Sequence, residues 1–275
     1  MLGGGGGPFG AHEVGMLRAL IERGIVPDLV LGTSVGAING VAIAAEPTAA
    51  GVERLSALWT DIDRSKVFDG SMVRRLATLA RTRTHLHGNG SLCRMLTELL
   101  PVSRIEDLTV PFQCVAASIE RASEHWFADG PIVPAVVASA SVPGLLPPVQ
   151  IGDEHFIDGG VVNSIPLSRA IALGAEEIYV LHVGRLDRPL EAPRSPWEVA
   201  LVAFEIARRH RFVGDLATVP SGVEVHVLQT GQQDPPRFTD RSQFRYRDTT
   251  SVRARIARAH EASARYLDEH GLGAS

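Results

Sequence analysis

The chain has 275 residues, of which 45% are hydrophobic and 21% charged, with a formal net charge of −4. This composition suits a globular α/β protein, and the negative charge argues against nucleic-acid binding, which needs a clustered positive surface. Two cysteines are too few for a disulfide framework or a zinc cluster. No apolar run reaches the roughly 20 residues that span a bilayer, and no signal segment precedes the first motif. We therefore expect a cytoplasmic protein that contacts a membrane only peripherally, if at all.

Strand and helix patterns alternate along the first part of the chain. A glycine run at 3–7 precedes a helical pattern at 11–23, whose apolar residues share one face. The apolar run 29–31 is typical of a buried parallel strand, and residues 35–45, rich in small side chains, predict a second helix. Residues 60–104 show no clear period and are interpreted as helices with a mobile loop.

The alternation continues to the end of the chain. Strands are predicted at 112–119, 125–127, 155–157, 177–183 and 223–229, and helices at 132–141, 166–173, 197–212 and 250–270. This pattern predicts an α/β fold with a central, mostly parallel sheet between layers of helices, a three-layer sandwich. We expect one domain over residues 1–275, with its motifs within 2–185 and a helical and strand extension over 186–275.

The segment Gly32-Thr33-Ser34-Val35-Gly36 fits the pattern Gly-x-Ser-x-Gly between a predicted strand and a predicted helix. Such a strand-to-helix turn exposes a nucleophilic serine, and its glycines remove side chains that would clash. The free N–H groups and the dipole of the helix would lie beside the serine oxygen. The alternative is that Ser34 only caps the helix.

Gly5, Gly6 and Gly7 precede the first helix, so several of their N–H groups can converge on an anion. The anion could be a nucleotide phosphate or the oxyanion of a tetrahedral intermediate. The run lacks the Gly-Lys-Ser/Thr ending of a nucleotide loop, and a flexible tail is a further alternative. The serine turn on the next strand–helix unit favours the oxyanion.

A serine hydroxyl needs a base to accept its proton. Asp158 is the candidate because it lies between a short strand and Gly159-Gly160, although Asp-Gly is also an ordinary turn. A Ser-His-Asp triad is the competing arrangement. For that triad, His182 at the end of a predicted strand is the best histidine candidate, while His12 could line the pocket.

Together these segments resemble the three motifs of the patatin-like phospholipases, in the family's order. The resemblance includes Gly10 after the glycine run, Gly32 and Gly36 around the serine, Gly159 and Gly160 after the aspartate, and the stretches 138–148 and 163–166. It implies that Ser34 is the nucleophile and Asp158 its proton acceptor, without a histidine. It also implies that the Gly5, Gly6 and Gly7 amides form the oxyanion hole, with no metal or organic cofactor.

The resemblance implies a serine esterase that hydrolyses carboxylic esters of phospholipids or other lipids through an acyl-enzyme. A lipid or acyl ester is thus the expected partner; a binding module with little turnover and an acyltransferase remain alternatives. The sequence departs from the family at Phe9, where Arg or Lys is usual, and only Met1-Leu2 precedes the glycines. Either the first strand is short or the natural start lies upstream. The arginines at 208–211 are interpreted as a solvated helix face, with a membrane-facing patch as the alternative.

Overall fold

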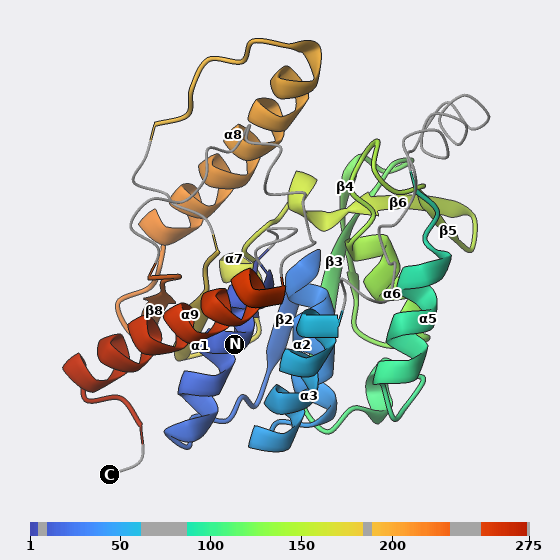
Figure 1. Ribbon diagram of the computed structural model, residues 1–275. Coiled ribbons are helices and arrows are strands. Elements are labelled where there is room, and N and C mark those ends of the chain that lie inside the picture. The colour runs from blue at the N-terminus through green and yellow to red at the C-terminus, as the bar shows by residue number, and fades with distance from the viewer. Residues whose placement is uncertain (5–9, 62–86, 184–188, 232–248, 274–275) are drawn as a thin grey trace.

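The computed structural model describes residues 1–4, 10–61, 87–183, 189–231 and 249–273. One sheet runs through the molecule and carries helices on both faces (Figure 1). Within the described residues the sheet has eight strands in the order β5-β6-β3-β2-β1-β7-β8, and β4 also pairs with β3. The layered arrangement that the sequence predicts is therefore present.

Five neighbouring strands form the parallel part of the sheet. They are β3 (Phe112–Ser118), β2 (Val30–Thr33), β1 (Leu2–Gly3), β7 (Glu177–Leu181) and β8 (Glu224–Leu228). All four residues of β2 are buried, as expected for a strand covered on both faces. Strand β1 is only two residues long, yet it pairs with β2 on one side and with β7 on the other.

Three strands form an antiparallel part at one side of the sheet. They are β4 (Ser123–Phe127), β5 (Val149–Ile151) and β6 (Glu154–Asp158). Strand β3 pairs antiparallel with both β4 and β6, and β5 pairs with β6. The register of β3 matters for the site, because β2 pairs with its first half and β6 with its last three residues.

One face of the sheet carries most of the helices. These are α1 (Gly10–Glu22), α2 (Val35–Ala45), α3 (Ala49–Asp61), α5 (Gly90–Leu99), α6 (Ile132–Ser139) and α9 (Thr249–Glu269), while α7 (Leu167–Ala172) and α8 (Pro196–Ala217) pack on the other face. Strand β8 extends the parallel sheet, and α9 lies along α1 (Figure 1). The C-terminal segment therefore adds a strand to the sheet and a helix to the layer that contains α1. Among the described residues, no helix is long and apolar enough to cross a membrane.

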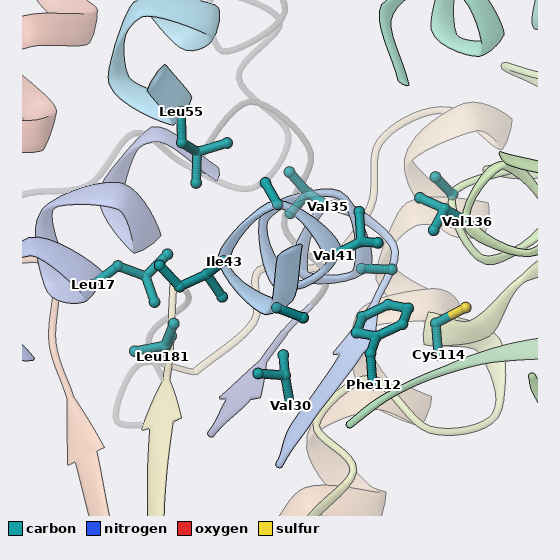
Figure 2. Close-up of a cluster of buried hydrophobic side chains, with 14 of the residues drawn as sticks. Leu17, Val30, Val35, Val41, Ile43, Leu55, Phe112, Cys114, Val136 and Leu181 are labelled. Atoms are coloured by element: carbon teal, nitrogen blue, oxygen red, sulfur yellow. The ribbon is translucent and has the colours of Figure 1, made fainter. Parts of the chain in front are cut away.

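Helix α2 lies at the centre of the larger core. Figure 2 shows its Val35, Val41 and Ile43 between the sheet and the neighbouring helices, with Val30 and Phe112 beneath them. Side chains alternate between the two cores along β7: Ile178 and Val180 enter the smaller core, whereas Tyr179 and Leu181 enter the larger one. The sheet thus separates the two cores, and α2, the helix that follows the serine, packs on β1, β2 and β3 in the larger one.

Each helix and strand predicted from the sequence is present, with ends shifted by a few residues. The predicted helix 132–141 ends at Ser139, because the Ser141 carbonyl leaves the helix and accepts a hydrogen bond from the Asp158 N–H (2.9 Å). Helix α3 was not predicted, although its buried residues Val52, Leu55 and Trp59 recur at helical spacing. Of the poorly patterned stretch 60–104, residues 62–86 lie outside the described residues, and α5 follows them.

Candidate active site

Ser34 occupies a strained turn between β2 and α2. Its φ of 57° and ψ of −123° lie in a region that costs a side-chain-bearing residue about 1–3 kcal/mol, so the surroundings must hold it there. The Ser34 N–H donates to Ser139 Oγ on α6 (3.0 Å), and the Ser34 carbonyl accepts from the Ala37 N–H (2.9 Å). The Ser34 side chain makes no capping hydrogen bond to α2, so the cap interpretation is wrong.

The two glycines of the serine motif are required by backbone contacts. A Cβ on Gly36 would lie 2.2 Å from the carbonyl carbon of Gly3, and one on Gly32 would lie 2.5 Å from Ala37 Cα. The end of β1 therefore touches the first turn of α2, one residue beyond Val35. This contact brings the entrance of the glycine run beside the serine.

Strand register brings Asp158 to Ser34. Thr33, the last residue of β2, pairs with Val115, and the next residue of β3, Ala116, pairs with Asp158. The ends of β2 and β6 therefore meet along β3. Ser34 Oγ donates a hydrogen bond of 2.6 Å to Asp158 Oδ2.

Asp158 is enclosed by backbone. The side chain is 1% exposed, and its Oδ1 accepts a hydrogen bond from the Gly160 N–H (2.7 Å). A Cβ on Gly159 would lie 2.2 Å from the Val115 carbonyl oxygen, and one on Gly160 would lie 2.8 Å from Phe204 on α8. A side chain at Gly159 would therefore clash with β3, and one at Gly160 would clash with α8. An ordinary Asp-Gly turn alone would not require both glycines.

The surroundings of Asp158 shift the pKa of its carboxyl group. Burial raises its pKa to about 6, against smaller lowering effects from the hydrogen bonds of Ser34 and Gly160 and from the positive charge of Arg208. At pH 7 the carboxyl group is therefore mostly ionised, yet it binds a proton more tightly than an exposed aspartate does. A carboxylate of this kind, 2.6 Å from a serine hydroxyl, can act as a general base.

The histidine of a triad is not supplied by His182. This side chain is buried beyond β7, stacks on Phe212 with ring centroids 6.0 Å apart, and makes no hydrogen bond to a described residue through either ring nitrogen. Burial, together with the charge of Arg208, lowers its pKa to about 3. His12 is fully buried within α1. The structure therefore brings Asp158, and not His182, to the Ser34 hydroxyl.

The predicted oxyanion residues Gly5, Gly6 and Gly7, and also Phe9, lie outside the described residues. Both flanks of this run are described. Gly3 touches Gly36, and a Cβ on Gly10 would lie 2.3 Å from Val35 Cγ2. The described residues on either side, Gly3 and Gly10, therefore lie beside the turn that carries Ser34.

Three charged residues of α8 differ from the solvated face that the sequence suggests. Glu205 and Arg208 are buried, and Arg208 donates to both carboxylate oxygens of Glu205 (2.9 Å each). Arg209 donates to the same carboxylate (2.8 Å). The solvated interpretation is wrong for Arg208, because α8 lies over the turn that contains Gly160. The described residues include no cluster of three or more side chains that could hold a metal ion.

Comparison with known proteins agrees with this geometry. Residues 2–171 match the family model of the patatin-like phospholipases. The chain belongs to this family. The match includes Ser34, Asp158 and the strands β1 to β6, and it confirms the predicted fold, a mostly parallel central sheet flanked by helices.

Curated relatives are much longer than the matched region. Patatin-like phospholipase domain-containing protein 7 of Rattus norvegicus is 31% identical over 186 residues, which are 67% of this chain and 13% of that protein. Patatin-like phospholipase domain-containing protein ZK370.4 of Caenorhabditis elegans is 34% identical over 188 residues (67% and 13%), and lysophospholipase NTE1 of Mycosarcoma maydis is 28% identical over 225 residues (79% and 11%). The solved structure of VipD from Legionella pneumophila is similar with a TM-score of 0.44 and 14% identity, over 98% of this chain and 66% of that one.

Proposed function

We propose that this chain is a lipid acyl hydrolase in which Ser34 is the nucleophile and Asp158 the general base. The observation that carries the proposal is the 2.6 Å hydrogen bond between Ser34 Oγ and a buried carboxylate, at a serine held in a strained turn. Strain that the surrounding contacts maintain is typical of functional sites. Membership of the patatin-like phospholipase family supports the same reaction class.

The proposed reaction has two steps. In the first, Asp158 accepts the hydroxyl proton as Ser34 Oγ attacks the ester carbonyl carbon, and the bond to the alcohol oxygen breaks as the alcohol leaves with that proton. In the second, water attacks the acyl group on Ser34 and gives a proton to Asp158. The Ser34 oxygen then leaves the acyl carbon and takes the proton back, which releases a fatty acid.

We assign the oxyanion of both tetrahedral intermediates to the backbone amides of Gly5, Gly6 and Gly7. The support is their position between flanks that touch the Ser34 turn at Gly36 and Val35. Donors of this kind are worth roughly 10²–10³ in rate each.

The substrate class we propose is a carboxylic ester of a phospholipid or lysophospholipid. The support is the family description and the name of one relative, a lysophospholipase. Because such substrates are in membranes or micelles, we also propose a cytoplasmic protein that contacts the lipid surface peripherally.

The test is fatty-acid release from phosphatidylcholine vesicles and from lysophosphatidylcholine micelles, by the wild-type protein and by Ser34→Ala. We expect release by the wild type and none above background by Ser34→Ala. The exposed turn serine Ser221 provides the matched control, and Ser221→Ala should retain wild-type release. Release by Ser34→Ala at the wild-type rate would contradict the assignment. Vesicle binding without release by the wild type would favour the binding-module alternative, and transfer of the acyl group to an added alcohol would favour the acyltransferase.

A further inference from the structure

A second buried carboxyl group lies close to the dyad but is not used by it. Glu13, in the first turn of α1, is completely buried, as are Asn39 on α2 (1% exposed) and Trp59 on α3 (5% exposed). These three residues form what we call the Glu13 cluster. An acid in such a place is costly unless polar partners surround it.

Hydrogen bonds connect the cluster across three helices. Trp59 Nε1–H donates to Asn39 Oδ1 (2.8 Å), and Asn39 Nδ2 donates to Glu13 Oε2 (2.7 Å). Asn39 Nδ2 also donates to the carbonyl oxygen of Gly10 (3.0 Å). Asn39 therefore uses both its amide nitrogen and its amide oxygen within the cluster.

The cluster touches the downstream flank of the glycine run at Gly10. At the downstream flank, the Gly10 carbonyl is bonded to Asn39, and a Cβ on Gly10 would lie 2.4 Å from the Trp59 ring. The described residue after the run, Gly10, is thus joined through Asn39 to α2, the helix that follows Ser34.

An apolar cluster would pack three helices at lower cost, because burying a carboxyl and an amide loses their hydration. Directional hydrogen bonds add what apolar packing cannot supply: a fixed position for the Gly10 carbonyl relative to α2. A displacement of about 1 Å in catalytic groups can cost about 10²-fold in rate.

We propose that Glu13, Asn39 and Trp59 are positioning residues that hold the glycine run in register with Ser34. They act on turnover through this run and do not touch the substrate. The proposal rests on the proposed function, because the run has a catalytic task only if its amides stabilise an oxyanion.

The protonation state of Glu13 follows from its surroundings. Burial raises its pKa to about 8, and the hydrogen bonds of Asn39 and Gly4 lower it by less. From α2 the Asn39 amide faces the carboxyl, and behind it lies the Trp59 indole of α3, which donates to Asn39; neither group titrates near neutral pH.

Two charged pairs join α1 to the helices beside it. Arg18 of α1 bonds Glu53 of α3 (2.7 Å), and His260 of α9 bonds Glu22 of α1 (2.6 Å). On α1 itself, His12 is the adjacent titratable side chain, and it is buried. At pH 7 the Glu13 carboxyl is therefore mostly protonated, and glutamine is its closest uncharged substitute.

The experiment compares the kinetics of wild type, Glu13→Ala and Glu13→Gln on a soluble ester. We expect Glu13→Ala to lower kcat by about tenfold or more with KM changed less than about threefold, because only the transition state needs the register. We expect Glu13→Gln to restore most of that kcat at pH 7. A Glu13→Ala protein with kcat within about threefold of wild type, or with a raised KM alone, overturns the proposal.

The pH profile supplies a readout that a purely structural role would not move. As pH rises through about 8, wild-type kcat should fall because Glu13 ionises beside the glycine run, whereas Glu13→Gln should not show this loss. The same alkaline loss in both proteins would contradict the proposal.

Two controls keep the outcomes separate. If Glu13→Ala does not fold, Trp59→Phe removes only the indole donor to Asn39 and should still lower kcat by about threefold or more at unchanged KM; wild-type kcat in that variant counts against the proposal. If the wild type itself has no turnover that depends on Ser34, the proposed function fails. Turnover that is unaffected by the Glu13 cluster overturns only the positioning role.

Discussion

Asp158 and Glu13 are two buried carboxyl groups near the same serine turn, and their surroundings set them apart. Burial raises the pKa of both. Asp158 receives hydrogen bonds from Ser34 and Gly160 and lies within the field of Arg208, so its pKa reaches only about 6. Glu13 accepts a hydrogen bond from the Asn39 amide, no cation among the described residues contributes to its pKa, and its pKa reaches about 8.

The comparison separates the acid that we propose as a base from the acid that we propose as a positioning residue. Near pH 7 Asp158 is mostly ionised and can accept a proton, whereas Glu13 is mostly neutral and resembles an amide in its hydrogen bonding. Burial alone would make both unsuitable as bases. The donors around each group, and the charge of Arg208 on α8, decide which one can act as a base.

The largest effect is expected for Asp158→Asn, which tests directly whether the two acids differ in role. The amide cannot accept the Ser34 proton, so kcat should fall by about 10³-fold or more, whereas Glu13→Gln should retain most of its turnover. Fatty-acid release under identical conditions measures both variants. Equal losses in the two variants would mean that the two acids do not differ in role.

The same variant should be more stable than the wild type at neutral pH. Because the pKa of Asp158 is about 6 in the folded protein and 3.8 for an ordinary solvated aspartate, the folded state binds more protons between these pH values. Wild-type stability should therefore fall as pH rises from about 4 to 6 and stay lower above that range. Asp158→Asn lacks this loss, so its advantage should be near zero at pH 4 and reach up to about 3 kcal/mol at pH 7. Denaturant unfolding at both pH values measures the difference; a constant difference would contradict it.

A smaller effect is expected at the contact between the end of β1 and the first turn of α2. Gly36→Ala places a methyl group 2.2 Å from the Gly3 carbonyl carbon, so β1 and the start of α2 must separate. We expect a loss of about 2 kcal/mol in the free energy of unfolding and a fall of about tenfold in kcat. The matched control is Gly214→Ala on α8, where a Cβ meets nothing within 4 Å and helix propensity should raise stability slightly. Equal changes in stability and in kcat for Gly36→Ala and Gly214→Ala would contradict the close contact between Gly36 and Gly3.

The smallest effect on turnover is expected for His182→Ala. This variant tests a third buried titratable group, in addition to Asp158 and Glu13. Its ring makes no hydrogen bond to a described residue, so kcat should stay within about threefold of wild type. Loss of the ring beside Phe212 should lower stability by about 1–3 kcal/mol. A loss of several orders of magnitude in kcat, in a folded variant, would restore the triad hypothesis.

The proposed dyad could be predicted from the sequence because Ser34 directly follows β2 and Asp158 is the last residue of β6. Apolar residues before Ser34 and Asp158 mark β2 and β6, and the glycines after them mark the turns. Their contact depends on the register of β3, which no local pattern contains. The resemblance of the motifs to those of the patatin-like phospholipases implies that pairing.

Other parts of the site depend on packing between distant segments. Glu13 in a first helical turn is ordinary on a solvated helix, where it complements the dipole. It is buried because α2 and α3 cover that face, and α3 was not predicted. The burial of Arg208 likewise follows from the position of α8 over Gly160, which the arginine-rich sequence of that helix does not reveal.

Labelling with a fluorophosphonate, followed by peptide mapping, tests the central assignment most directly, because the reagent reports an activated serine without knowledge of the substrate. We predict that the wild type is modified at Ser34 and that Asp158→Asn, shown to be folded, is modified at least about 10²-fold more slowly. Modification of Ser34 at equal rates in both proteins would contradict the role of Asp158. A folded wild type that is not modified, or that is modified at another serine, would contradict the assignment of Ser34 as the nucleophile.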